Sequence, residues 1–159
     1  MAVDGAAAVA KMLRSNRTLR FLDLGLLKAT SALGEVPNRI TDEGAMMLAA
    51  ALEENSTLNG LVLVHNTIHQ AGLKAIQTSI SKNTSLVKLE LEQLGIAYNE
   101  LTREEIRHTL NKNRRKFQET PEEWQKIQEA LDPAHLEEIK SVYRMGNTYS
   151  PHGEPEMVD

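Results

Sequence analysis

One segment of this sequence recurs at an interval of 28 residues, and the repetition constrains the fold more than any other feature. Residues 57–68 (TLNGLVLVHNTI) align with residues 85–96 (SLVKLELEQLGI). Their leucines match in pairs: Leu58 with Leu86, Leu61 with Leu89, and Leu63 with Leu91. The same spacing occurs earlier in the chain, at Leu19, Leu22 and Leu24. A fixed repeat of this length predicts that similar units stack, each packing against its neighbours.

A helical stretch precedes each leucine segment and ends in asparagine; the three stretches are 5–16, 44–55 and 72–83. In the second stretch the apolar side chains fall on one helical stripe, at Met47, Leu48, Ala51 and Leu52. The last leucines of each leucine segment alternate with other residues, which is typical of a short strand with one apolar face. A single helix and strand cannot bury both apolar faces, so the unit requires stacked copies.

The leucine spacing resembles the leucine-rich repeat family, in its 28-residue, ribonuclease-inhibitor-like form. The family signature, L-x-x-L-x-L-x-x-N-x-I followed by glycine, is complete from Leu58 to Ile68, with Gly72 after it. The resemblance covers residues 5–117. It implies an α/β fold, a short solenoid with a concave parallel sheet, convex helices and a C-terminal helical extension. It also implies that Asn66 is buried and bonds neighbouring backbone.

The other two copies depart from this signature where the strand leads into the loop. Leu24 lies far ahead of Asn38, which predicts an insertion within residues 25–38. A shorter insertion separates Leu91 from Asn99. We expect both insertions to change the local position of the asparagine and to leave the fold intact.

Charge divides the chain into a repeat region and a C-terminal part. Residues 103–117 hold six basic and two acidic side chains, whereas residues 118–159 hold three basic and ten acidic ones. We therefore expect a repeat solenoid over residues 1–117, a helical pair over residues 118–144 and a disordered tail over residues 145–159.

The helical pair has clear start signals. Thr120 and Pro121 are typical of an N-cap and a first helical position, and they predict a helix over residues 121–131. A second helix is expected over residues 133–144. The simpler interpretation is that the pair covers the C-terminal end of the stack. The alternative is that the pair, with Trp124, is itself a docking element.

The N-terminal end of the predicted stack has no strand before its first helix. Stacked repeats expose an apolar face at each end, and that face needs a cap. Either the first helix, rich in alanine at residues 6–8, serves as this cap, or the edge pairs with something else. That partner would be either a second copy of the chain, which would give a homodimer, or further repeats.

The resemblance also implies a binding surface, because the family binds partners through strand side chains on the concave sheet. Transferring those positions selects seven residues: Phe21, Asp23, Val62, Val64, Lys88, Glu90 and Glu92. An aromatic and β-branched centre rimmed by charge suits a protein partner. The alternative is that the insertion within residues 25–38 folds back over this surface.

Two further groups have simpler explanations than a ligand site. His65 and His69 lie four residues apart, but they flank Asn66 and lack a third ligand, so a hydrogen-bonded pair is favoured over a metal site. The basic cluster at residues 112–116 could bind phosphate or an acidic protein surface. Cations near a helix C-terminus also complement the helix dipole, and the acidic C-terminal part could neutralise the cluster.

The chain contains none of the usual catalytic motifs. There is no cysteine, no glycine-rich phosphate loop, no G-x-S-x-G and no H-E-x-x-H, so we expect no enzyme activity, no cofactor and no metal. The net charge of −4 and the lack of interleaved aromatics argue against nucleic acid. No apolar run approaches the ~20 residues that cross a bilayer, so we expect no membrane partner.

These observations predict an intracellular, cytoplasmic, non-catalytic module that binds a protein partner. The helix-ending N-x-[ST]-L phrase, the short array and the helical extension are also similar to the actin pointed-end cappers of the tropomodulin class. The same phrase occurs in innate-immune sensor repeats. A third hypothesis is an enzyme-linked repeat protein: either an enzyme, or an activator of a small GTPase like the repeat-built activator of Ran, although no residues that would organise a switch region can be identified.

Overall fold

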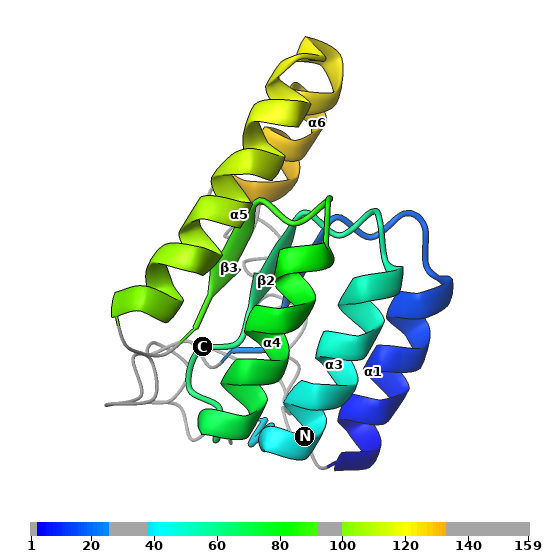
Figure 1. The fold of residues 1–159 in the computed structure, drawn as a ribbon. Helices are drawn as coiled ribbons and strands as arrows, with labels where there is room; N and C mark the ends of the chain where they lie inside the picture. Colours follow the sequence, from blue (N-terminus) through cyan, green and yellow to red (C-terminus); the bar gives the residue numbers. More distant parts are fainter. Residues whose placement is uncertain (1–2, 26–37, 92–99, 133–159) are drawn as a thin grey trace, which may run out of the picture.

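The computed structural model describes residues 3–25, 38–91 and 100–132. Helices and strands alternate along these residues, as the repeat predicts (Figure 1). The elements are α1 (Val3–Ser15), β1 (Phe21–Asp23), α3 (Asp42–Glu54), β2 (Gly60–Val62), α4 (Gln70–Lys82), β3 (Lys88–Glu90), α5 (Glu100–Gln118) and α6 (Pro121–Leu131). The predicted α/β class is confirmed.

The three described strands form one parallel sheet in the order β1-β2-β3. Leu22 pairs with Leu61, and Leu61 pairs with Leu89, so the matching leucines of the repeat lie on adjacent strands. Helices α1, α3 and α4 stand side by side on one face of this sheet (Figure 1). The stacking predicted from the leucine spacing is therefore confirmed.

The core lies between these helices and the sheet. The repeat leucines fill it from the strand side, and Leu58, Leu61 and Leu86 are completely buried. Leu48, Leu52, Ile76 and Ile80 fill it from the helix side. Each such side chain contributes about 2 kcal/mol of hydrophobic stabilisation, so the stack depends on every unit supplying its leucines.

The asparagines that end the helices join each unit to the one before it. The side-chain oxygen of Asn83 accepts from the N–H groups of Ser85 and Leu86, at 3.0 and 2.7 Å. Its amide donates to the carbonyl groups of Leu52 and Asn55, at 2.7 and 3.1 Å. Asn55 makes the equivalent bonds one unit earlier. These buried amides satisfy backbone groups that the chain reversals leave without partners.

Helix α5 continues the stack as its fourth helix. Asn113, which is 4% exposed, donates to the carbonyl groups of Asn83 and Leu86 at 3.0 and 2.9 Å. Its bond to the Asn83 carbonyl matches the bond that Asn83 makes to the Asn55 carbonyl, whereas its second bond goes to Leu86 rather than to the preceding helix. Thr102, which precedes Asn113 by the same interval as Gly72 precedes Asn83, lies inside α5.

The predicted structural role of Asn66 is confirmed. Asn66 is 6% exposed, and its oxygen accepts from the N–H group of Ile40 at 2.8 Å. Its amide donates to the carbonyl groups of Leu24 and Leu63, each at 3.0 Å. Asn38 also donates to the Leu24 carbonyl, at 2.9 Å, so the first copy keeps this contact despite its insertion. Asn99 lies outside the described residues.

Helix α6 begins at Pro121, as predicted, and runs back along α5 (Figure 1). Thr120 precedes it as N-cap without a side-chain hydrogen bond, so the proline, rather than a capping box, marks the start. The second predicted helix over 133–144, the tail over 145–159 and most of the insertion within 25–38 lie outside the described residues.

At the other end of the stack, α1 and β1 form the N-terminal edge of the described residues. Pairing of this edge with a second copy of the chain stays a prediction.

A search of the described residues for a helix with the length and apolar character of a membrane span finds none.

Candidate functional site

The face of the sheet opposite α1, α3 and α4, called here the sheet face, carries the residues selected from the repeat. Leu22 and Leu89 pack against the core, so by strand alternation their neighbours Phe21, Asp23, Lys88 and Glu90 belong to the sheet face. The register arranges this face in two rows. The first row is Phe21, Gly60 and Lys88, and the second is Asp23, Val62 and Glu90.

In the first row, side chains of the two outer strands, β1 and β3, contact each other across Gly60 of the middle strand, β2. Gly60 has no side chain, and a Cβ there would lie 2.6 Å from Cδ2 of Phe21, so the ring covers the glycine. The Nζ of Lys88 lies 5.7 Å from the centroid of this ring. That distance is typical of a cation–π contact, which is worth about 0.5–1 kcal/mol at an exposed site.

Helix α6 covers the same row. A Cβ at Gly60 would collide with Cδ2 of Leu131, so the last turn of α6 lies directly over the glycine. Nη2 of Arg20 lies 3.8 Å from Oε1 of Glu123, which belongs to the first turn of α6. Ile127, which lies between Glu123 and Leu131 along this helix, is completely buried. The helix thus occupies the part of the sheet face next to the strand starts, which no repeat position predicted.

The second row is more open and carries two carboxylates. Asp23 and Glu90 are exposed on the outer strands, on either side of Val62. Oδ1 of Asp23 accepts from the N–H of Gly25 at 2.8 Å, and Oε1 of Glu90 lies 3.0 Å from Nζ of Lys88. Both carboxylates are therefore held in place by short contacts within their own strands.

The valines expected to form an open apolar centre on the sheet face are buried or half-buried in the structure. Val62 is buried, with 6% of its surface exposed, so it does not present an open apolar contact. Val64 is half-buried against Gly25, where a Cβ would lie 2.8 Å from Cγ2 of the valine. Glu92, the last selected residue, lies outside the described residues. The accessible part of the sheet face is therefore polar and acidic rather than apolar.

Arg20 and Asn59, which the sequence did not single out, support this arrangement. Asn59 is 1% exposed; its oxygen accepts from Nη1 of Arg20 at 2.9 Å, and its amide donates to the carbonyl of Ser85 at 2.9 Å. Each of these two residues directly precedes a strand. A polar residue at that repeated position is the signal that could have identified them.

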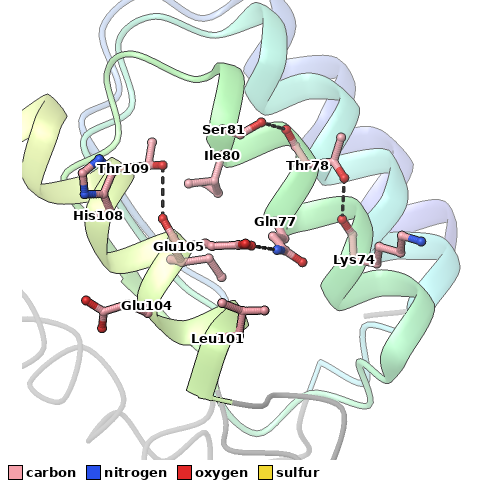
Figure 2. Close-up of a pocket in the computed structure, with 11 residues that line it drawn as sticks. Lys74, Gln77, Thr78, Ile80, Ser81, Leu101, Glu104, Glu105, His108 and Thr109 are labelled. Atoms are coloured by element: carbon pink, nitrogen blue, oxygen red, sulfur yellow. Dashed lines mark hydrogen bonds between the residues drawn. The ribbon is translucent and has the colours of Figure 1, made fainter.

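A groove lies on the helix side, between α4 and α5 (Figure 2). Its volume is about 670 Å³, and its lining includes Lys74, Gln77, Ile80, Leu101, Ile106 and His108. Leu101 is 67% exposed, and Figure 2 shows it beside the Gln77 amide, which donates a hydrogen bond to Glu105 across the groove. No pattern in the sequence predicted this groove.

The groove coincides with a difference at one repeat position. A Cβ at Gly72 would lie 2.9 Å from the Cβ of Ala45, so glycine allows α3 and α4 to pack closely. Thr102 takes the equivalent place in the sequence of α5, because it precedes Asn113 as Gly72 precedes Asn83. Helix α5 therefore lacks the glycine that brings α4 close to α3, and a groove lies between α4 and α5.

The titratable groups of the described residues do not gather into a metal site. No three of the described His, Asp and Glu side chains are grouped so as to hold a metal ion. The N–H of His69 donates to Oδ1 of Asp42 at 2.7 Å, a structural contact at the start of α4. A hydrogen bond from Arg107 lowers the pKa of Glu104.

Comparisons with known proteins agree with this fold. A sequence model of the family described as Leucine Rich repeat matches residues 38–49. No curated protein matches the sequence significantly. A solved chain titled Leiomodin-1 Actin-Binding Site 2 (ABS2) is similar in structure, with a TM-score of 0.52, 18% identity and coverage of 79% of this chain and 82% of that chain.

The match and the paired leucines together give a short leucine-rich-repeat fold, which is a protein-binding fold. At 18% identity the solved chain supports the fold alone. The narrower prediction, the 28-residue ribonuclease-inhibitor-like form, stays a prediction.

Proposed function

We propose that this chain is a non-catalytic protein-binding module whose sheet face binds basic side chains of a partner. The observation that carries the proposal is the second row, in which Asp23 and Glu90 are exposed on either side of buried Val62. Strands held by a packed core keep the two carboxylates at a fixed separation. Little conformational entropy is then lost when a partner binds, which favours affinity.

The first row complements this surface. Phe21 is half-buried under the Lys88 ammonium group, and Leu131 covers Gly60 beside it. An aromatic ring and a leucine next to carboxylates supply the apolar contact that a purely charged surface lacks. Val64, selected from the repeat, extends the proposed site beyond the second row, and Glu92, which lies outside the described residues, stays a prediction.

We expect Asp23→Lys combined with Glu90→Lys to weaken partner binding at least about tenfold, because two cations would replace the anions that face the partner. The protein would be immobilised, a captured partner identified, and its dissociation constant measured for both forms. Glu53→Lys with Glu54→Lys is the matched control, since these exposed carboxylates of α3 also make ion pairs, with Lys82 and Arg14. Unchanged affinity in the sheet-face variant would contradict the proposal.

Binding to the pointed end of actin filaments is the second candidate function. It is favoured by the structural similarity to a chain titled as an actin-binding site of leiomodin-1, together with α6, the described helix of the predicted C-terminal extension. This extension follows the repeats directly, as the resemblance to the tropomodulin class implies.

If this candidate is right, the protein should slow the depolymerisation of fluorescent actin filaments whose barbed ends are blocked. The expected reduction is at least about twofold at saturating protein, because a bound cap stops subunit loss at the remaining end. The variant with Asp23→Lys and Glu90→Lys should slow it less if the sheet face is the contact. A rate equal to that of filaments alone would remove actin as the partner and leave the sheet-face proposal standing.

A further inference from the structure

A stripe of cations runs along one side of α5. His108, Lys112, Arg115 and Lys116 follow one another at helical spacing and line a hollow of about 410 Å³. Within the described part of the chain, no ion pair involves Lys112, Arg115 or Lys116. Five cations elsewhere in the described residues do form ion pairs, namely Arg14, Arg20, Lys82, Lys88 and Arg107. The stripe therefore concentrates positive charge that the described residues leave available.

The stripe continues the groove between α4 and α5. His108 lines both the groove and the hollow, so the two adjoin at this residue. Leu101 lies at the apolar end and Lys116 at the basic end of the same helix. Fifteen helical steps separate them, so the combined surface is about 22 Å long. A segment of about seven extended residues, or about four turns of helix, spans that length.

The acidic residues of the groove are already engaged. Oε1 of Glu104 lies 2.7 Å from Nη2 of Arg107, and Glu105 accepts the amide of Gln77. Lys74 on the α4 wall adds to the positive charge of the surface. Glu119, at the far end of the hollow, leaves the balance positive. A ligand that approaches this surface therefore meets an apolar floor followed by cations.

We propose that the groove and the stripe form one docking surface for a partner-protein segment with apolar side chains at one end and acidic side chains at the other. The apolar end fits between α4 and α5 against Leu101, and the acidic end fits Lys112, Arg115 and Lys116. The chain as a whole carries a net charge of −4, so an extended polyanion such as nucleic acid or a membrane would meet repulsion beyond this short stripe. This surface lies on α4 and α5, and its assignment does not rest on the sheet face.

The test uses the full chain and fluorescent synthetic peptides in an anisotropy titration. The probe has a leucine-rich first half and a glutamate-rich second half. We expect it to bind, and we expect affinity to fall at least about tenfold when its glutamates become glutamines or its leucines become serines. Lys112→Glu with Lys116→Glu, and separately Leu101→Glu, should each produce a loss of the same size.

Matched controls come from the same chain. Met46→Glu changes the other large apolar side chain that is exposed in the described residues, at 51%, and Lys11→Glu with Arg39→Glu reverses two exposed cations elsewhere. Both controls should bind the probe like the original chain. Circular dichroism and thermal unfolding should show that all four variants keep the fold, since the changed side chains are exposed.

Three results would overturn the proposal. Absence of probe binding is the first, and equal loss in the control variants is the second. The third is evidence of a different occupant. One such result is tighter binding of phosphatidylserine vesicles, or of a single-stranded oligonucleotide, than of the probe. The other is a tenfold gain in probe affinity when four glutamates of the C-terminal part are changed to glutamine: Glu137, Glu138, Glu154 and Glu156. That gain would mean that the chain's own acidic segment competes for the stripe.

Discussion

Replacing Asn83 with alanine is expected to lower the free energy of unfolding by about 3–5 kcal/mol. Asn83 is 4% exposed and makes four hydrogen bonds to backbone groups at the joint between two repeats. Alanine would leave the N–H groups of Ser85 and Leu86 and the carbonyl groups of Leu52 and Asn55 without these partners. Urea unfolding monitored by circular dichroism measures the change.

The substitution Asn83→Asp separates the two halves of this role. Aspartate keeps an acceptor for the Ser85 and Leu86 N–H groups, but it has no donor for the carbonyl groups of Leu52 and Asn55. A carboxylate would also face two carbonyl oxygens in a buried place, so a loss comparable to that of alanine is expected.

Asn111→Ala is the control, because Asn111 is an exposed asparagine of α5 and should change stability by less than about 0.5 kcal/mol. Equal stability of the Asn83 and Asn111 variants would mean that the joint does not depend on the amide.

The repeat spacing was sufficient to predict the stacking of the strands. The pairing of Leu22, Leu61 and Leu89 follows from spacing alone, since equivalent positions of stacked units must lie side by side. The buried role of Asn66 came with the family resemblance. The helix-ending asparagines were recognised as markers only, because their amide bonds reach back into the preceding repeat and no local pattern reports such a contact.

The candidate site was predictable only where it depends on strand alternation. Asp23 and Glu90 lie on the accessible part of the sheet face, as alternation requires. The return of α6 over Gly60 was not predicted, because the direction of a helix after a turn depends on the packing of Ile127 and Leu131, which have no counterpart in the repeats.

The groove between α4 and α5 coincides with a change at one repeat position. The α5 stretch reads as a further helix of the stack, and its Asn113 bonds confirm that it is one. The difference lies at Thr102, which replaces the glycine of the preceding units. An apolar stripe predicts that two helices pack, but the distance between them depends on the size of the residues at the contact.

The close packing of α3 and α4 predicts a second large effect on stability. Gly72→Val should lower the free energy of unfolding by about 3 kcal/mol, because the added atoms have no space. A Cβ at Gly72 would lie 2.7 Å from Oδ1 of Asp42 and 2.9 Å from the Cβ of Ala45. Asp42 accepts from the N–H groups of His69 and Gly72 at 2.7 and 3.0 Å, so displacing it also weakens the start of α4.

Ala71→Val is the matched control, since Ala71 is the exposed neighbour of Gly72 in the same turn of α4. Valine at an exposed helical position costs about 0.5 kcal/mol through helix propensity alone. A comparable small loss at Gly72 would mean that helices α3 and α4 tolerate a wider spacing.

Gly72→Ala gives the sharper comparison, because helix propensity and packing act in opposite directions. Alanine favours a helix over glycine by about 1 kcal/mol, so propensity alone predicts a gain in stability. The Ala45 Cβ belongs to a side chain that cannot rotate away, so we expect a net loss measured by urea unfolding. Such a loss would come from the contact between α3 and α4, where the added Cβ would lie 2.9 Å from the Cβ of Ala45.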